Sequence, residues 1–177
     1  MSRGAFMVSS VLVLGSSWAA LSQDTAPAER KKVADGVYAV VRDSLKEKEL
    51  LPLKDGEVLL VNRHRYLKKG KNEPPRFLVV GANPEVTLDL AERPKAVKEG
   101  EEVVRILLKL QPKPAAALER LTRKQLGRQV AIVLGSEVVT MHKVRGVING
   151  GAVQITSCAP GAAKYLLEQL QARKERK

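Results

Sequence analysis

The stretch Val130–Leu134 constrains the fold more than any other, because all five of its side chains are apolar. A strand with one face in water alternates polar and apolar residues, whereas a run without polar residues is typical of a strand covered on both faces. We therefore expect a central strand here. With 177 residues, 44% of them hydrophobic, the chain can bury such a strand in a real core. Aromatic residues make up 3%, so Val, Leu, Ile and Ala must fill that core.

The residues around this strand predict further strands and helices. The expected elements are a strand over 103–110, a helix over 115–126, strands over 130–134, 137–143 and 152–156, and a helix from Pro160. Asn149-Gly150 is a tight-hairpin signal, because both residues accept a positive φ. The natural solution for this order is two helices on one face of a mainly antiparallel sheet. The fold class predicted for residues 101–173 is therefore α+β, a ferredoxin-like two-layer sandwich, followed by a charged tail at 174–177.

Residues 33–100 predict a smaller, strand-rich part before this domain. Short apolar runs bounded by turn residues favour strands over 37–41, 57–61, 76–80 and 86–90. Ser44 and Glu47 have the spacing of a capping box, which favours a short helix over 44–51. Residues 91–100 contain Pro94 and Gly100 and are expected to be a linker between the two parts.

The first 22 residues are typical of a secretory signal peptide. Arg3 precedes an uncharged, mostly apolar stretch, and the small residues Ala20 and Ser22 precede a cleavage position at Gln23. The signal is either cleaved or kept as a membrane anchor. Residues 23–32 are polar and are expected to form a disordered tether. We therefore expect an extracytoplasmic protein, periplasmic or secreted.

The formal net charge of +12 favours acidic partners: nucleic acid, anionic lipid head groups, acidic glycans or acidic polypeptides. Charge alone does not choose among these, and a basic surface can also serve solubility. The densest basic run gives a candidate anion-binding loop at Arg63, Arg65, Lys68, Lys69 and Lys71. The same run also fits a solvated hairpin tip. Nucleic acid is disfavoured, because Tyr66 is the one aromatic residue there and a single-strand site needs several.

No set of residues with the spacing of a catalytic or metal site is found in the sequence. His64, His142 and Cys158 include no pair at the short spacing of metal ligands. Ser136 and Ser157 lack an identifiable base and orienting acid. The glycines of 146–151 open no helix and precede no Lys-Ser/Thr pair, so they are not a phosphate loop. A single cysteine excludes an intrachain disulfide, and Cys158 is either a small core residue or an intermolecular bridge. We expect no enzyme activity and no cofactor.

One segment carries a resemblance to a known family. Leu121–Leu134, which reads LTRKQLGRQVAIVL, resembles the helix–strand segment of SecD, the accessory subunit of the bacterial protein-export channel. Further similar pieces are Glu137–Val139, Ile148–Gly151, Val153–Ile155 and Ala162–Leu170. Together they are similar to the head subdomain of the first periplasmic domain of SecD/SecDF, over about residues 103–170. Met141-His142 departs from the Ala-Pro that the family often has.

The resemblance implies a non-catalytic extracytoplasmic module that contacts polypeptide or an envelope protein partner, linked to protein export. Contact through an exposed sheet edge, to which a partner adds a strand, is one way to do this. The candidate edge residues are Val138, Val139, Thr140, Met141, Val153 and Ile155. The alternative function is a basic binder of anionic envelope polymer or lipid head groups through the loop at 63–71. The oligomeric state stays open.

Overall fold

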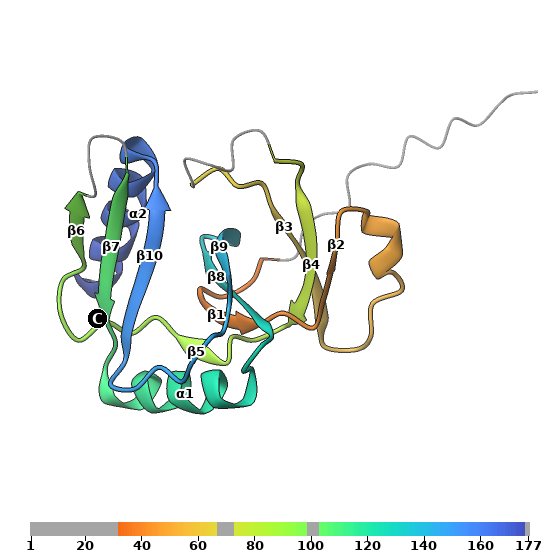
Figure 1. The fold of residues 1–177 in the computed structure, drawn as a ribbon, viewed down its shortest axis with the longest axis horizontal. Coiled ribbons are helices and arrows are strands. Elements are labelled where there is room, and N and C mark those ends of the chain that lie inside the picture. Colours follow the sequence, from red (N-terminus) through yellow and green to blue (C-terminus); the bar gives the residue numbers. More distant parts are fainter. Residues whose placement is uncertain (1–31, 67–72, 99–102, 176–177) are drawn as a thin grey trace, which may run out of the picture. The chain divides into compact units, whose positions relative to one another are not determined.

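The computed structural model describes residues 32–66, 73–98 and 103–175. Its strands are β1 Gly36–Ala39, β2 Arg42–Ser44, β3 Glu57–Asn62, β4 Arg76–Gly81, β5 Val86–Thr87, β6 Lys95–Lys98, β7 Val104–Lys109, β8 Gln129–Leu134, β9 Glu137–Lys143 and β10 Ala152–Cys158 (Figure 1). Its helices are the 3₁₀ turn η1 Glu47–Leu50, α1 Pro112–Lys124 and α2 Pro160–Glu175. The signal segment 1–22 and tether residues 23–31 lie outside the described residues. In the described part, no helix is long and apolar enough to cross a membrane.

The strands pair antiparallel in three sheets. The middle sheet has the order β5-β1-β8-β9, the C-terminal sheet β10-β7-β6 and the N-terminal sheet β2-β4-β3. The chain passes from the middle sheet to the N-terminal sheet at Val40 and Val41, whose amides donate to Gln129 and Val79. Two sheets contain strands from both sides of the domain boundary expected near residue 100. β1 and β5 lie in the same sheet as β8 and β9, and β6 pairs with β7. Lys31–Lys177 accordingly form one compact unit.

Strand β8 lies between β1 and β9 and is covered on both faces, as its apolar run predicted. Its register places Ile132 opposite Val37 on one side and Thr140 on the other. Ile132 and Leu134 enter one hydrophobic cluster, whereas Ala131 and Val133 enter a second one. Because side chains alternate along a strand, this single strand supplies both cores.

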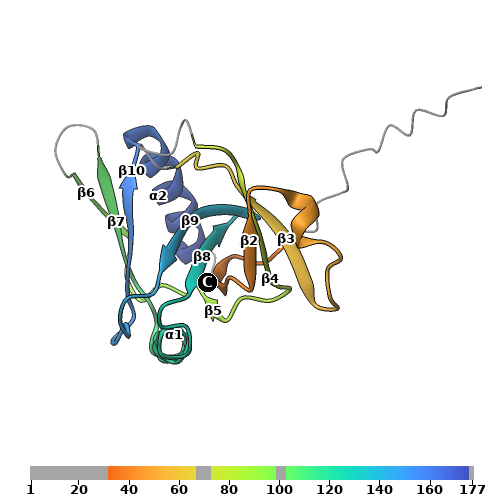
Figure 2. The same cartoon turned by 45° about the vertical axis from the view of Figure 1, so that its right-hand side comes forward.

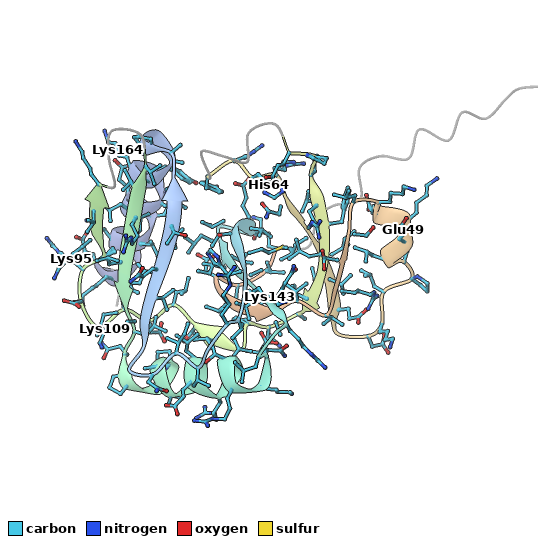
Figure 3. The ribbon with its side chains drawn as sticks, in the orientation of Figure 1. Glu49, His64, Lys95, Lys109, Lys143 and Lys164 are labelled. Carbon is cyan, nitrogen blue, oxygen red and sulfur yellow. The ribbon has the colours of Figure 1, made fainter. Side chains whose placement is uncertain are left out.

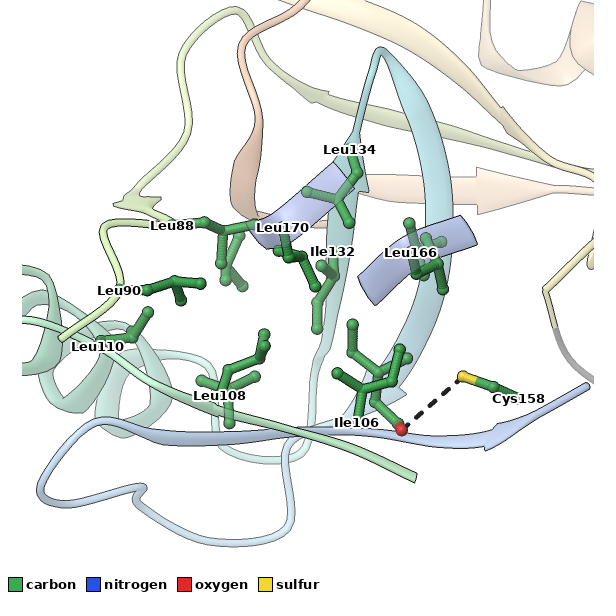
Figure 4. Close-up of a cluster of buried hydrophobic side chains, with 14 of the residues drawn as sticks. Leu88, Leu90, Ile106, Leu108, Leu110, Ile132, Leu134, Cys158, Leu166 and Leu170 are labelled. Carbon is green, nitrogen blue, oxygen red and sulfur yellow. Dashed lines mark hydrogen bonds between the residues drawn. The ribbon is translucent and has the colours of Figure 1, made fainter. Parts of the chain in front are cut away.

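The larger core lies between the middle and C-terminal sheets and takes in both helices. Helix α1 contributes Leu118 and Leu121, and α2 contributes Leu166 and Leu170. In Figure 4 the two α2 leucines gather with leucines and isoleucines of β7 and β8. The second view shows α2 beside the C-terminal sheet (Figure 2). Both helices therefore pack into one core, but this core lies between two sheets, whereas the sequence predicted one face of a single sheet.

The smaller core lies between the middle and N-terminal sheets. Tyr38 of β1 and Val133 of β8 pack there against Leu78 and Val80 of β4, and all four side chains are buried. Tyr38 also donates from its hydroxyl to the carbonyl oxygen of Ala34. The strand-rich N-terminal segment is therefore an integral layer of the fold.

The ferredoxin-like arrangement expected for residues 101–173 is not found, because the four expected strands do not form one sheet. Strands β7 and β10 pair with each other, whereas β8 and β9 belong to the middle sheet. The neighbours that replace them come from the first half. β1 pairs with β8, and β6 pairs with β7, with Ala96 opposite Ile106. The fold class is thus α+β with mostly sheet.

Three local expectations also need correction. The supposed linker contains β6, whose four side chains are all exposed and so give no apolar alternation. Helix α1 ends at Lys124, which leaves Leu126 outside the core and 50% exposed. The turn at Gly150 and Gly151, both at positive φ, leads from β9 into a different sheet, not into a hairpin with it.

The larger core predicts a clear difference between two leucine substitutions. Leu166→Ala should lower the free energy of unfolding by about 2–5 kcal/mol, because Leu166 is fully buried. Leu126→Ala removes the same atoms from a half-exposed site and should change it by less than about 0.5 kcal/mol. Urea unfolding followed by circular dichroism measures both. Equal losses would contradict the assigned core.

Candidate functional site

The six predicted edge residues lie on two strands that are both outermost in their sheets. β9 ends the middle sheet and β10 ends the C-terminal sheet. Five of the six side chains are buried, however, and Met141 is half-buried. Their side chains therefore hold the cores together, and what these strands offer a partner is chiefly their backbone, with Val153 also lining a groove. Whether this edge binds polypeptide stays a prediction.

A groove of about 610 Å³ lies between the two strands. One wall is the edge of β10, from Ala152 to Thr156, and the other is the end of β9 at His142 and Lys143. Its apolar floor takes side chains from four elements, namely Val37, Leu118, Val130, Ile132 and Val153, and Val144, Ile148 and Ala152 add to the apolar lining. An apolar floor beside an outermost strand is the combination that suits an added strand, since the edge pairs with backbone and the floor takes side chains.

The segment between β9 and β10 forms the end of the groove and is fixed to α1. The Ile148 amide donates to the Thr122 hydroxyl at 3.0 Å, and that hydroxyl donates to the Leu118 carbonyl oxygen at 2.9 Å. Val144 exchanges backbone hydrogen bonds with the chain at Gly127 and Arg128. At Gly151 the backbone approaches so closely that an added Cβ would lie 2.5 Å from the Cβ of Ala115. The groove is therefore held in shape before any partner arrives.

The charges at the groove are positive. Lys143 and Arg145 are exposed and line it, and none of its lining residues is Asp or Glu. His142 also lines it, with Nε2 3.0 Å from the Thr140 hydroxyl oxygen. Burial lowers the pKa of His142, so its imidazole is neutral at neutral pH. The fixed charge facing a ligand therefore comes from Lys143 and Arg145.

The candidate anion-binding loop is only partly described, since Lys68, Lys69 and Lys71 lie outside the described residues. Arg63 is exposed. Arg65 forms an ion pair of 2.9 Å with Glu137, and this carboxylate also accepts the Tyr66 hydroxyl. Desolvation of Tyr66 and its bond to Glu137 raise the pKa of this phenol. The start of the loop is thus fixed to β9.

Tyr66 also connects this loop to α2. Its ring stacks on that of Tyr165 with the centroids 6.3 Å apart, and its carbonyl oxygen accepts the Ala159 amide at 3.0 Å. A hollow of about 440 Å³ adjoins the two rings. Tyr66 is therefore chiefly a core residue here, and its presence in a basic run does not by itself indicate stacking with a ligand. Anion binding by this loop stays a prediction.

The residues considered for chemistry are separated or structurally engaged. No group of three metal-ligating side chains occurs among the described residues. The Ser136 hydroxyl donates to the carbonyl oxygen of Val33 and accepts from its amide, both at 3.2 Å. The side chain of Ser157 lies outside the described residues. Cys158 is a fully buried free thiol, and burial raises its pKa to about 11.

Sequence patterns missed several groove residues because no periodicity marks them. Thr122 was hidden in the polar part of a helix, and Gly151, which holds the end of the groove against α1, followed a turn signal that was interpreted as a hairpin. Lys143 and Arg145 are ordinary surface residues in the sequence. Val153 was predicted, but as an edge side chain, not as part of a floor. The spacing of Thr122 and Ile148 across 26 positions explains why only the fold brings them together.

Comparisons with known proteins agree on one family. The family model of the SecDF P1 head subdomain matches residues 61–173. A solved structure of "a membrane component SecDF that enhances protein export" is 28% identical, with a TM-score of 0.46 over 59% of this chain and 44% of that chain. A structure of "SecDF in Super-membrane-facing form" is 29% identical, with a TM-score of 0.46 over 54% of this chain and 13% of that chain. This chain therefore covers less than half of either solved chain. No curated protein matches it.

The backbone of Gly151 lies close to α1, so we expect an alanine to destabilise the protein more at Gly151 than at Gly127. Gly151→Ala and Gly127→Ala both place a side chain at positive φ, which should cost about 1 kcal/mol. At Gly151 the new methyl also meets Ala115, which should add about 1–3 kcal/mol. Gly127 faces open space. Denaturant unfolding of the two variants compares them, and equal costs would contradict the contact.

The buried thiol predicts a slow alkylation reaction. At pH 8 a pKa of about 11 leaves roughly a hundredfold less thiolate than the ordinary value of 9.0. Iodoacetamide should thus modify Cys158 at least about a hundredfold more slowly in the folded protein than in denaturant. Because the folded pKa is raised, the thiol's contribution to stability is present below pH 9.0 and lost as the pH rises toward about 11. Rapid labelling of the native protein at pH 8 would refute this burial.

Proposed function

Since this chain belongs to the SecDF P1 head subdomain family, we propose that it is a non-catalytic module that binds extended polypeptide in the groove between β9 and β10, in support of protein export. The observation that carries this proposal is the outermost position of β10 directly beside an apolar floor. We propose an extracytoplasmic location, periplasmic or secreted, with the signal segment either removed or retained as an anchor.

Strand addition explains how such a groove would bind chains of varied sequence. The backbone of β10 offers the same donors and acceptors to any extended segment, so affinity does not require particular side chains. The seven residues of β10 span about 23 Å at 3.3 Å per residue, enough for a typical strand. The floor then adds the favourable burial of alternate apolar side chains. Segments that are already paired inside a folded protein cannot add to β10, so the groove favours unfolded chains or exposed extended segments.

The anion-binding alternative has weaker support from the contacts. Arg65 is already paired with Glu137, and each surface ion pair with a polymer contributes only about 0–1 kcal/mol. The groove, by contrast, combines an edge, a floor and a fixed shape. A partner protein of the envelope would use the same edge if it presents an extended segment.

Site-directed photocrosslinking tests the proposal. A benzoylphenylalanine placed at Gln154 on β10 should crosslink a reduced, carboxymethylated unfolded protein several-fold more than one placed at Val97 on β6. Both positions are exposed, and the two strands are opposite edges of one sheet, so β6 is a matched control. The same unfolded protein should slow hydrogen exchange of β10 amides. Equal crosslinking at both positions, or crosslinking of folded proteins with the same yield, would refute the groove.

A further inference from the structure

We infer that the groove selects extended segments that carry apolar side chains at alternate positions and a carboxylate at the end near Lys143 and Arg145. This inference rests on the proposed function and adds a substrate preference to it. It follows from three observations: the groove has cations at its rim, β10 is an outermost strand, and the side chains of a strand added to β10 would point alternately toward and away from the apolar floor.

Among the described residues, the two cations at the rim of the groove have no carboxylate partner beside them, whereas several arginines elsewhere on the protein do. Arg65, Arg93 and Arg123 each have a carboxylate partner. Within the described part of the chain, Lys143 and Arg145 form no ion pair, and both are exposed where they line the groove. Figure 3 labels Lys143, at the end of β9. A carboxylate bound here would meet two positive groups and no negative one.

The apolar requirement follows from the geometry of an added strand. Side chains of a strand point alternately to its two faces. A segment paired with β10 therefore directs every second side chain toward the floor formed by Leu118, Ile132 and Val153. The intervening side chains lie beside Gln154, which is polar and exposed. A segment with alternating apolar and polar residues places apolar side chains on the floor and polar side chains toward solvent, whereas a run of charged residues would leave the apolar floor exposed to water.

The backbone of β10 distinguishes a polypeptide from an anionic amphiphile. A fatty acid could also place its chain on the floor and its carboxylate near Lys143. It would, however, offer no hydrogen-bonding groups to the row of amides and carbonyls along β10. Since buried polar groups without partners are costly, a ligand that pairs with them is favoured. We therefore assign the groove to polypeptide.

Fluorescence anisotropy with labelled 12-residue peptides tests the preference. The peptides share one alternating apolar–polar core and end in either three glutamates or three lysines. The acidic peptide should bind at least about tenfold more tightly, since each exposed charge contact changes sign between the two peptides. This ratio should shrink in 1 M salt, where the screening length falls to about 3 Å.

Two variants of equal net charge separate the rim from the general positive charge. Lys143→Glu with Arg145→Glu should abolish or reverse the preference for the acidic peptide. Lys95→Glu with Lys98→Glu changes the same charge on β6, at the opposite edge of the sheet, and should leave the preference within about twofold. Both variants should fold, because all four side chains are exposed, and circular dichroism checks this.

Each result decides the inference. Equal binding of the two peptides, or equal effects of the two double variants, would overturn the preference while polypeptide binding itself remained. Tighter binding of laurate than of the acidic peptide, with the same dependence on Lys143 and Arg145, would assign the groove to an amphiphile and overturn the inference. No binding of any peptide would overturn both this inference and the proposed function.

Discussion

The alternation of side chains along β8 is the constraint on which the structure depends. Ile132 and Leu134 fill the core shared with the helices, and Ala131 and Val133 fill the core shared with the N-terminal sheet. A strand used in this way needs neighbours that are themselves apolar on both faces. β1 meets the requirement, since Val37 and Tyr38 enter different cores. The pairing of β8 with an element almost a hundred residues away is therefore a consequence of burial on both faces.

The candidate site is a by-product of this pairing. Because β8 takes β1 and β9 as neighbours, β7 and β10 are left to form a separate sheet with β6. β9 and β10, which follow one another in the chain, are thus outermost strands of different sheets. The segment that connects them is fastened to α1 by Thr122 and by the tight contact at Gly151. A groove between two strand edges results, and alternate side chains of both strands, such as Val139 and Val153, anchor its walls in the larger core.

Local elements could be predicted well from the sequence, whereas their partners could not. The bounds expected for the strand 137–143 agree with β9, and the covered run 130–134 lies inside β8. Apolar periodicity reports how many faces of a strand are buried, but it contains no information on which strand lies beside it. β6 was missed for a related reason: all its side chains are exposed, so backbone pairing alone makes it a strand.

The groove could be predicted only as two separate segments. Its floor joins Val37, Leu118 and Ile132, which no short motif connects. The resemblance found in 121–134 did identify the family, because that segment is where helix, turn and central strand meet.

The exposed lysines of β6 have a consequence for how the molecules behave in a concentrated solution. Because the outer edge of β10 is unpaired among the described strands, the sheet could extend from molecule to molecule, with β6 of one copy pairing with β10 of the next. Lys98 and Lys95, which is itself paired with Glu92, would then approach Lys143 and Arg145, and the contact would carry an excess of positive charge. Head-to-tail association of sheets is thereby disfavoured, so the edge of β10 can remain free for a ligand without making the protein prone to fibre formation.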